Sequence, residues 1–121
     1  MPRHVLDPEH IHPAIRETVS GHYRHVVDEV RQAVASNDVV VVGMAGNPYP
    51  RRARALLDRA GIRYRYLSYG SYFSQWRLRS AIKMWCGWPT LPIVFVKGTL
   101  VGGWADLRRL HDSGELARLL A

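Results

Sequence analysis

Cysteine is almost absent from this 121-residue chain, which holds only Cys86. A single cysteine excludes an intramolecular disulfide framework and a metal site built from several thiolates of one chain. No apolar run approaches the roughly 18 residues that a membrane-spanning helix needs. The first thirteen residues carry three His and three Pro and lack the apolar stretch of a signal peptide. We therefore expect a soluble, cytoplasmic protein without a membrane partner.

Acidic residues are scarce, with 10 Asp and Glu against 17 Lys and Arg, which gives a formal charge of +7. Part of this excess is concentrated in an arginine-rich segment between residues 51 and 65. Such a surface attracts anions and acidic proteins, and a merely solvated basic face is the simpler alternative. No RNA-binding motif accompanies the arginines, which disfavours nucleic acid as a partner. An acidic protein partner would meet Arg51, Arg52, Arg54 and Arg59.

The length fits one domain with its own core. We expect residues 1–25 to form a partly helical N-terminal extension and residues 26–121 to form the domain. Apolar side chains recur every three or four residues from 14 to 36, which predicts an amphipathic helix that Gly21 bends or divides. The four consecutive valines at 39–42 predict a strand buried on both faces.

Strand and helix patterns alternate in the rest of the chain. The segment 71–86 predicts a helix with Trp76, Ala81, Ile82 and Trp85 on its inner face. The other expected elements are a helix at 51–60 ended by Gly61, a strand at 62–67, a hairpin of strands 93–96 and 99–101, and short helices at 104–111 and 115–120. This order predicts an α/β, thioredoxin-like fold with a four-stranded mixed sheet flanked by helices.

A proline-containing motif and a glycine pair carry a resemblance to a known family. The motif Trp88-Pro89-Thr90-Leu91-Pro92, followed by a hairpin and Gly102-Gly103, resembles the C-terminal half of glutaredoxins. Arg79 and Lys83 before the motif, and Ser113-Gly114-Glu115-Leu116 after it, are most similar to the monothiol branch. The resemblance covers about residues 26–121.

The resemblance implies where a ligand would lie. In glutaredoxins the second proline is cis, and the residue before it, here Leu91, pairs through its backbone with the cysteinyl unit of glutathione. The glycine pair opens a helix whose N-terminus suits a carboxylate, and Arg79 would face the glycyl carboxylate. The implied site for a glutathione-like ligand consists of Asn47, Tyr49, Arg79, Thr90, Leu91, Pro92, Gly103, Trp104 and Ala105.

The sequence departs from the family where the chemistry should be. Asn47-Pro48-Tyr49-Pro50 aligns with the family's Cys-Pro-Tyr-Cys or Cys-Gly-Phe-Ser motif, so Asn47 replaces the nucleophile and Pro50 the second Cys or Ser. The family's loop lysine is replaced by Met44 or Ala45. Its aspartate after the Gly-Gly-x triplet is replaced by Ala105, with Asp106 one place later. Trp104 would lie on the rim of the ligand site.

Two roles remain open for Asn47. Free amides at a helix N-terminus attract anions, so the position could still help to bind a thiol or an anion. Alternatively, Asn47 merely caps the helix and the site is vestigial. We expect a glutaredoxin-like protein without ordinary thiol–disulfide activity, which uses the old glutathione groove as a binding or regulatory module.

Cys86 carries an alternative hypothesis, in which a glutathione-dependent oxidoreductase works through this thiol or through a thiol of its substrate. An inert, buried Cys86 is the favoured interpretation, because a helix C-terminus disfavours a thiolate. A [2Fe–2S] cluster is disfavoured because its family ligand is replaced by Asn47. The histidines are interpreted as scattered surface residues and not as metal ligands: His4, His10, His12, His22 and His25.

Overall fold

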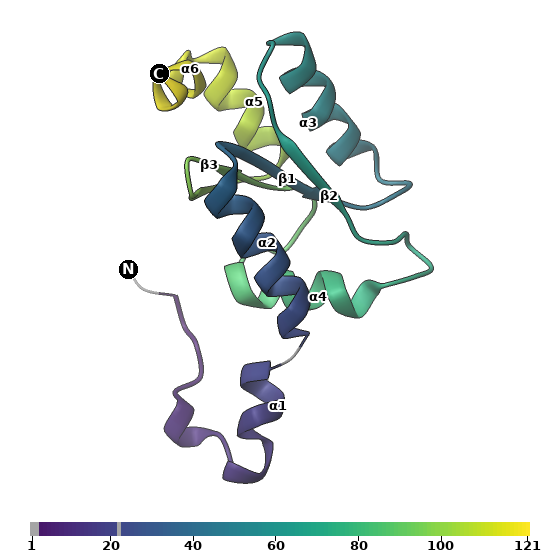
Figure 1. Ribbon diagram of the computed structural model, residues 1–121, viewed down its shortest axis with the longest axis vertical. Coiled ribbons are helices and arrows are strands. Elements are labelled where there is room, and N and C mark those ends of the chain that lie inside the picture. The colour runs from purple at the N-terminus through teal and green to yellow at the C-terminus, as the bar shows by residue number, and fades with distance from the viewer. Residues whose placement is uncertain (1–2, 22) are drawn as a thin grey trace.

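The computed structural model describes residues 3–21 and 23–121 (Figure 1). Four strands form one mixed sheet in the order β2-β1-β3-β4, in which β1 pairs parallel with β2 and antiparallel with β3. The strands are β1 (Val39–Gly43), β2 (Arg65–Ser68), β3 (Ile93–Val96) and β4 (Thr99–Gly102). Both the thioredoxin-like fold and the mixed sheet are confirmed.

Helices cover both faces of the sheet because the side chains of β1 alternate between them. Val40 and Val42 pack with α2 and α4 on one face, while Val39 and Val41 pack with α3, α5 and α6 on the other. The helices are α1 (Arg16–Gly21), α2 (Arg24–Ser36), α3 (Pro48–Arg59), α4 (Trp76–Cys86), α5 (Trp104–Asp112) and α6 (Glu115–Leu120). Short 3₁₀ turns at Pro8–His10 and Pro13–Ile15 precede them.

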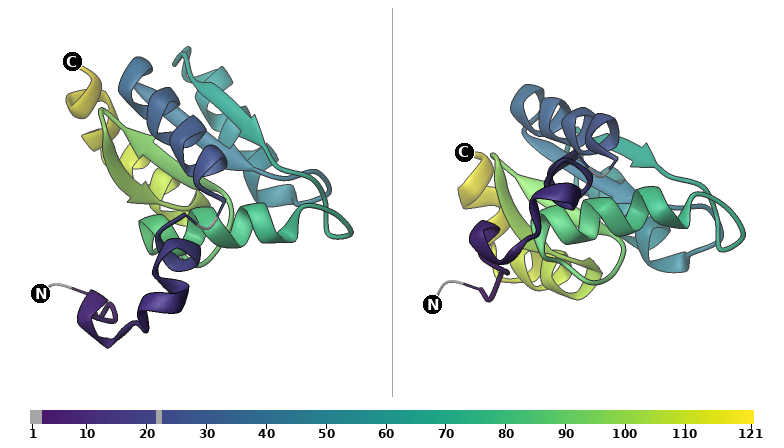
Figure 2. Two further views of the ribbon diagram at one scale, coloured as in Figure 1. Left: turned by 60° about the horizontal axis from the view of Figure 1, so that its bottom comes forward. Right: turned by 90° about the horizontal axis from the view of Figure 1, so that it is seen from below.

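The N-terminal extension projects from the body of the molecule, as Figure 1 and the left view of Figure 2 show. The predicted helix over 14–36 is divided, since α1 ends at Gly21 and α2 begins at Arg24 after Tyr23 in the left-handed region. Val26 and Val30 are buried, but Ile15 and Val19 are exposed. One contact ties the start of the extension back, because Arg3 Nη2 donates to the carbonyl of Trp85 at 3.1 Å.

Helix α4 corrects one prediction about packing. Trp76 was expected on the inner face, but it is 60% exposed, whereas Ala81 and Ile82 are buried and Trp85 packs against the core. The helix begins at Trp76 and not near residue 71. At about 100° per residue, Trp76 lies about 240° around the helix from Ile82 and therefore cannot share its face.

Strand β2 begins three residues later than predicted. The amide of Ile62 donates to the carbonyl of Leu57 at 2.9 Å, and residues 62–64 form part of the connection between α3 and β2. Ile62, Tyr64 and Tyr66 pack partly against the core on the α3 side, as their alternation predicts. Of the described residues, no helix has both the length and the apolar character needed to span a bilayer.

Candidate functional site

Three loop segments meet at one edge of the sheet. Strand pairing places Gly43 opposite Ser68, Val42 opposite Ile93, and Val94 opposite Gly102. The chain leaving β1, the chain entering β3 and the chain leaving β4 therefore lie together. We call this region, residues 44–50, 88–92 and 103–105, the strand-end corner. It gathers the predicted site residues apart from Arg79, which lies on α4.

The N-terminus of α3 is closed by its own residues. Asn47 is the N-cap, and its Oδ1 accepts a hydrogen bond from the amide of Tyr49 at 3.0 Å. The two neighbouring helical positions are Pro48 and Pro50, which have no N–H. None of the first three helical residues of α3 therefore has an amide left for a ligand. These three positions offer no free, anion-attracting amide, and the structure shows Asn47 as the helix cap. Ligand binding at Asn47 stays a prediction.

Close packing holds this N-terminus against the end of β1. A Cβ on Gly43 would lie 2.8 Å from Cβ of Pro50 and 2.6 Å from the hydroxyl of Tyr66. Only glycine permits such an approach of the helix and β2 to the strand. Pro50 is correspondingly buried, whereas Tyr49 is exposed and lies beneath the guanidinium of Arg52, 5.2 Å from Cζ to the ring centroid.

The loop before β3 contains the expected cis bond between Leu91 and Pro92. The side chain of Leu91 packs into the core on the α2 and α4 side, and Thr90 before it is exposed. Among the described residues, none forms a hydrogen bond with the backbone N–H or C=O of Leu91. One donor and one acceptor therefore remain at the spacing that an added extended peptide requires.

The N-terminus of α5 keeps free amides, in contrast to that of α3. Its N-cap, Gly103, lies against the cis-proline loop, because a Cβ there would be 3.3 Å from Nε1 of Trp88 and 3.4 Å from the carbonyl oxygen of Pro92. No hydrogen bond within the described part of the chain uses the amides of Trp104 and Ala105. These donors, with the positive end of the helix dipole, can receive a carboxylate.

Asp106 is already engaged inside α5. Its Oδ2 accepts from the amide of Gly103 at 3.0 Å, and its Oδ1 accepts from Nη2 of Arg109 at 2.9 Å. The Gly103 hydrogen bond lowers the pKa of this carboxyl below its ordinary value, and Arg109 adds to the effect. Both carboxylate oxygens of Asp106 therefore already accept hydrogen bonds within α5.

Arg79 has partners of its own. The side chain is 7% exposed, and its Nη1 donates to the carbonyl oxygens of Tyr69 at 2.8 Å and of Ser74 at 2.7 Å. These bonds fasten the loop between β2 and α4 to the first turns of α4. Contact between Arg79 and a ligand carboxylate stays a prediction, and the observed role of this guanidinium is structural.

Trp104 turns toward α3. It is half-buried against the core cluster that includes Leu56, and it lines the cleft between α3 and α5. Its backbone amide thus belongs to the strand-end corner, whereas its ring lines a different surface. The indole Nε1 of Trp88 is buried without a partner in the described part of the structure, beside Gly103.

Cys86 lies toward the opposite end of the sheet. It lines a groove with Phe95, which pairs with Val40, and with Gly98 of the β3–β4 turn. That turn is next to the start of β1, because the amide of Lys97 donates to Asp38 at 2.7 Å. Burial is the largest influence on the thiol and raises its pKa. The thiol is within hydrogen-bonding reach of the backbone of Trp88, the first residue of the 88–92 segment, although the groove that it lines includes no residue of the strand-end corner.

The loop between β2 and α4 is a part of the site that the sequence patterns missed. The amide of Ala45 donates to the carbonyl of Gly70 at 2.8 Å, and the ring of Tyr72 lies near Gly46. Phe73 in the same loop is 99% exposed. The segment has no helical or strand periodicity, so its only signal was a run of aromatic residues without a core-facing pattern.

One of the described histidines, His10, belongs to a group of potential metal ligands. The one group of three potential ligands in the described part of the chain is Asp7, Glu9 and His10, all exposed. His4, His12 and His25 are not members of it, and His22 lies outside the described residues.

The mixed sheet, the cis-proline loop and the two helix N-termini at one edge define a protein of the thioredoxin-like class. The sequence matches the Glutaredoxin family over residues 39–101. This chain belongs to the glutaredoxin family.

Individual relatives agree with this assignment. A glutaredoxin-like protein of Dictyostelium discoideum is 43% identical over 102 residues, which cover 84% of this chain and 83% of the relative. The chloroplastic glutaredoxin-C4 of rice is 33% identical, with 78% and 71% covered. Among solved structures, a buckwheat glutaredoxin–glutathione complex superimposes with a TM-score of 0.70 at 26% identity, covering 83% of this chain and 91% of that one.

Proposed function

We propose that this protein is a glutaredoxin-like binding or regulatory module that holds glutathione, or a similar small thiol or anionic ligand, without reacting with it. One contrast carries the proposal. The N-terminus of α3 is sealed by Asn47, Pro48 and Pro50, while the backbone of Leu91 and the amides at the start of α5 have no partners among the described residues. The helical amides of α3 that could stabilise a thiolate are therefore engaged or absent, whereas the backbone groups expected to bind a ligand remain available.

The absence of ordinary thiol–disulfide chemistry follows from the side chains at the corner. An amide such as Asn47 cannot form a mixed disulfide, because that step needs a thiolate to attack the disulfide sulfur. The Tyr49 amide, which could stabilise a thiolate at a helix N-terminus, donates to Asn47 instead. Cys86 lies toward the other end of the sheet and burial raises its pKa, so it does not supply the missing nucleophile.

Glutathione fits the groups that remain. Its cysteinyl backbone can pair with the N–H and C=O of Leu91, and its γ-glutamyl carboxylate can accept from the amides of Trp104 and Ala105. The solved buckwheat relative holds glutathione. Affinity should be low, because a lysine in the loop and an aspartate at position 105 would each add a charged hydrogen bond that stabilises binding by about 1.5–3 kcal/mol. Because this chain lacks both residues, it should bind glutathione about a hundredfold or more weakly than a protein that has them.

An iron–sulfur cluster does not fit the corner. Cluster irons take thiolate ligands, and the position that would supply one holds Asn47. We therefore propose no cluster at this site.

Titration with S-methylglutathione, which cannot form disulfides, tests the proposal. We expect NMR amide shifts at Leu91, Trp104 and Ala105 that saturate in the millimolar range. A glutathione-linked disulfide reductase assay on wild type should show no turnover. Absence of shifts at tens of millimolar ligand would reject the binding role. Robust turnover that disappears in Cys86→Ser would instead establish the enzyme alternative.

A second candidate function rests on the surface beside the corner. Arg51, Arg52 and Arg59 of α3 are exposed, and the exposed aromatic residues nearby in sequence or space include Tyr49 and Tyr72. Arg54 is less available, because its guanidinium stacks on the ring of Tyr66 at 4.1 Å. An acidic protein segment is the complementary partner. Its binding should weaken steeply with salt and in Arg51→Gln/Arg52→Gln, and salt-independent binding would exclude this candidate.

A further inference from the structure

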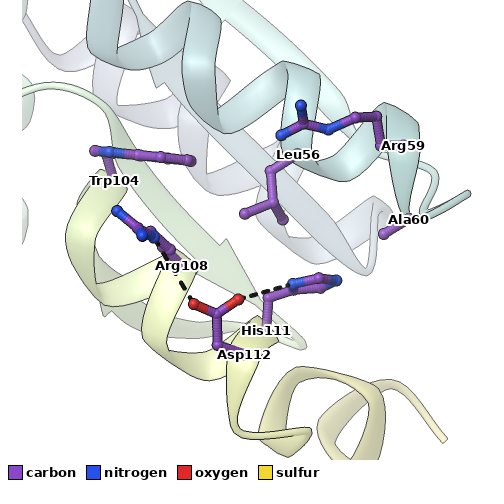
Figure 3. Close-up of a pocket in the computed structure, with 7 residues that line it drawn as sticks. All are labelled: Leu56, Arg59, Ala60, Trp104, Arg108, His111 and Asp112. Carbon is purple, nitrogen blue, oxygen red and sulfur yellow. Dashed lines mark hydrogen bonds and ion pairs between the residues drawn. The ribbon is translucent and has the colours of Figure 1, made fainter.

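A cleft of about 400 Å³ lies between α3 and α5, apart from the predicted glutathione groove (Figure 3). The α3 side contributes Leu56, Arg59 and Ala60. The α5 side contributes Trp104, Arg108, His111 and Asp112, which recur at the spacing of one helix face. The volume of the cleft is within the range of small-molecule pockets.

The cleft combines an apolar plane with cationic groups. The ring of Trp104 and the side chain of Leu56 form the apolar part, and the small side chain of Ala60 leaves room between the helices. Figure 3 shows the side chain of Arg59 lying along α3 above Leu56, and that of Arg108 on α5 between Trp104 and Asp112; both line the cleft. An aromatic ring stacked on Trp104 would place a substituent within reach of these guanidinium groups.

Both arginines keep donors for an anion. Arg108 forms an ion pair with Asp112 through Nε at 3.7 Å, and no hydrogen bond to a described residue engages its Nη1 or Nη2. Arg59 forms no ion pair with any described residue. The single carboxylate in the cleft, Asp112, is shared between Arg108 and His111, whose Nδ1 lies 3.4 Å away. The cleft therefore carries a net positive charge beside an apolar surface.

We propose that this cleft binds a small molecule made of a planar aromatic ring with one anionic substituent, such as a carboxylate, sulfonate or phosphate. The ring stacks on Trp104 over Leu56, and the anion is held by Arg59 and Arg108. An anionic acceptor should contribute more binding free energy than a neutral one, because charge-assisted hydrogen bonds to guanidinium groups are the stronger kind. The site uses side chains that the glutathione groove does not need, and the two proposals can fail separately.

Naphthalene-1-sulfonate is a suitable probe, because it contains both features. Its titration is followed by the indole Nε1–H resonance of Trp104 in NMR spectra, assigned with Trp104→Phe. Two matched probes separate the contributions, since 1-naphthalenemethanol has the ring without charge and methanesulfonate has the charge without the ring. We expect naphthalene-1-sulfonate to bind about tenfold or more tightly than either.

A pair of charge-matched variants tests the role of the arginines. Arg59→Gln/Arg108→Gln should weaken naphthalene-1-sulfonate about tenfold or more and leave 1-naphthalenemethanol unchanged. The control Arg51→Gln/Arg77→Gln removes the same charge from exposed positions outside the cleft and should have little effect. All four arginines are exposed, and circular dichroism checks that each variant is folded.

Three results would overturn the proposal: equal binding of the sulfonate and the neutral probe, equal weakening in both double variants, or shifts confined to Leu91 and Ala105 in place of the Trp104 indole. Saturating S-methylglutathione should leave the probe affinity unchanged. Competition between the two ligands would likewise contradict a separate site.

Discussion

Oδ1 of Asn47 lies 3.0 Å from the amide nitrogen of Tyr49, so the side chain at the family's nucleophile position serves as a helix cap. This bond accounts for the one N–H among the first three helical residues of α3, since the other two are prolines. The side chain of Asn47 therefore stabilises the start of α3.

Removing this cap should destabilise the protein. Asn47→Ala leaves the Tyr49 amide without its acceptor, and we expect the free energy of unfolding to fall by about 1 kcal/mol. Asn47→Asp keeps an acceptor and should remain close to wild type. Urea unfolding of the three proteins checks this, and an Asn47→Ala protein as stable as wild type would show that the observed bond contributes nothing.

A cysteine introduced at position 47 should be able to form a mixed disulfide with glutathione. In Asn47→Cys/Cys86→Ser the Tyr49 amide becomes available to a thiolate, and the nearby Arg51 and Arg52 favour the ionised form. We expect this thiol to form a mixed disulfide with oxidised glutathione, measured by mass spectrometry, and to react about tenfold faster than Cys86 of wild type. Asn47→Ser/Cys86→Ser is the control. A cysteine at 47 that stays unmodified would mean that the corner does not place glutathione beside this position.

Arg79 should contribute to the stability of the protein in the absence of any ligand. Arg79→Ala leaves the carbonyls of Tyr69 and Ser74 without their donor, and we expect the free energy of unfolding to fall by about 1–3 kcal/mol. Hydrogen exchange in the 69–75 loop should accelerate. Arg77→Ala, an exposed neighbour on the same helix, should change neither quantity. If both variants have the same small effect, the two carbonyl bonds do not hold the loop.

The cap at α5 should make stability depend on pH in the acid range. The folded pKa of Asp106 is lowered, so its contribution is present above the ordinary aspartate value of about 3.9 and is lost as pH falls through the folded value. The stability difference between wild type and Asp106→Asn should therefore be largest near neutral pH and shrink below about pH 5. Urea unfolding as a function of pH measures this. A difference that does not change with pH would contradict the role of the carboxylate charge.

Cys86 should be a slow nucleophile. Because burial raises its pKa, the thiolate is a minor species near neutral pH. Iodoacetamide should alkylate it several-fold more slowly than a free cysteine at pH 7, with a rate that continues to rise with pH beyond the ordinary cysteine pKa of about 8.5, where the rate of a free cysteine levels off. Intact-mass measurement over time gives both rates. Alkylation as fast as that of a free cysteine at pH 7 would revive Cys86 as a catalytic candidate.

The sheet and its cis-proline loop could be predicted because their signals are local. Four consecutive valines specify β1, and Lys97-Gly98 between two β-rich runs specifies the hairpin, where both residues have positive φ. The motif ending in Pro92 predicted the cis bond.

The features that could not be predicted depend on contacts with backbone atoms or on where a helix leaves the core. Arg79 binds two carbonyls of the preceding loop, and no sequence pattern identifies a carbonyl as an acceptor. The start of α4 was missed because its first turn extends beyond the core and carries no periodicity, which left Trp76 exposed. The lack of free amides at the first helical residues of α3 could have been predicted from the sequence, because Pro48 and Pro50 have no N–H.

Pro50 also limits how this lineage could change again. A single substitution at Asn47 reaches at most a monothiol form, whereas a dithiol form must also replace Pro50. That ring is buried against Gly43, where a Cβ on the glycine would be only 2.8 Å away. Replacement of Pro50 by cysteine removes this packing before a second sulfur can contribute any advantage. A dithiol arrangement at this corner therefore requires two substitutions, one of which disturbs the contact between α3 and the end of β1.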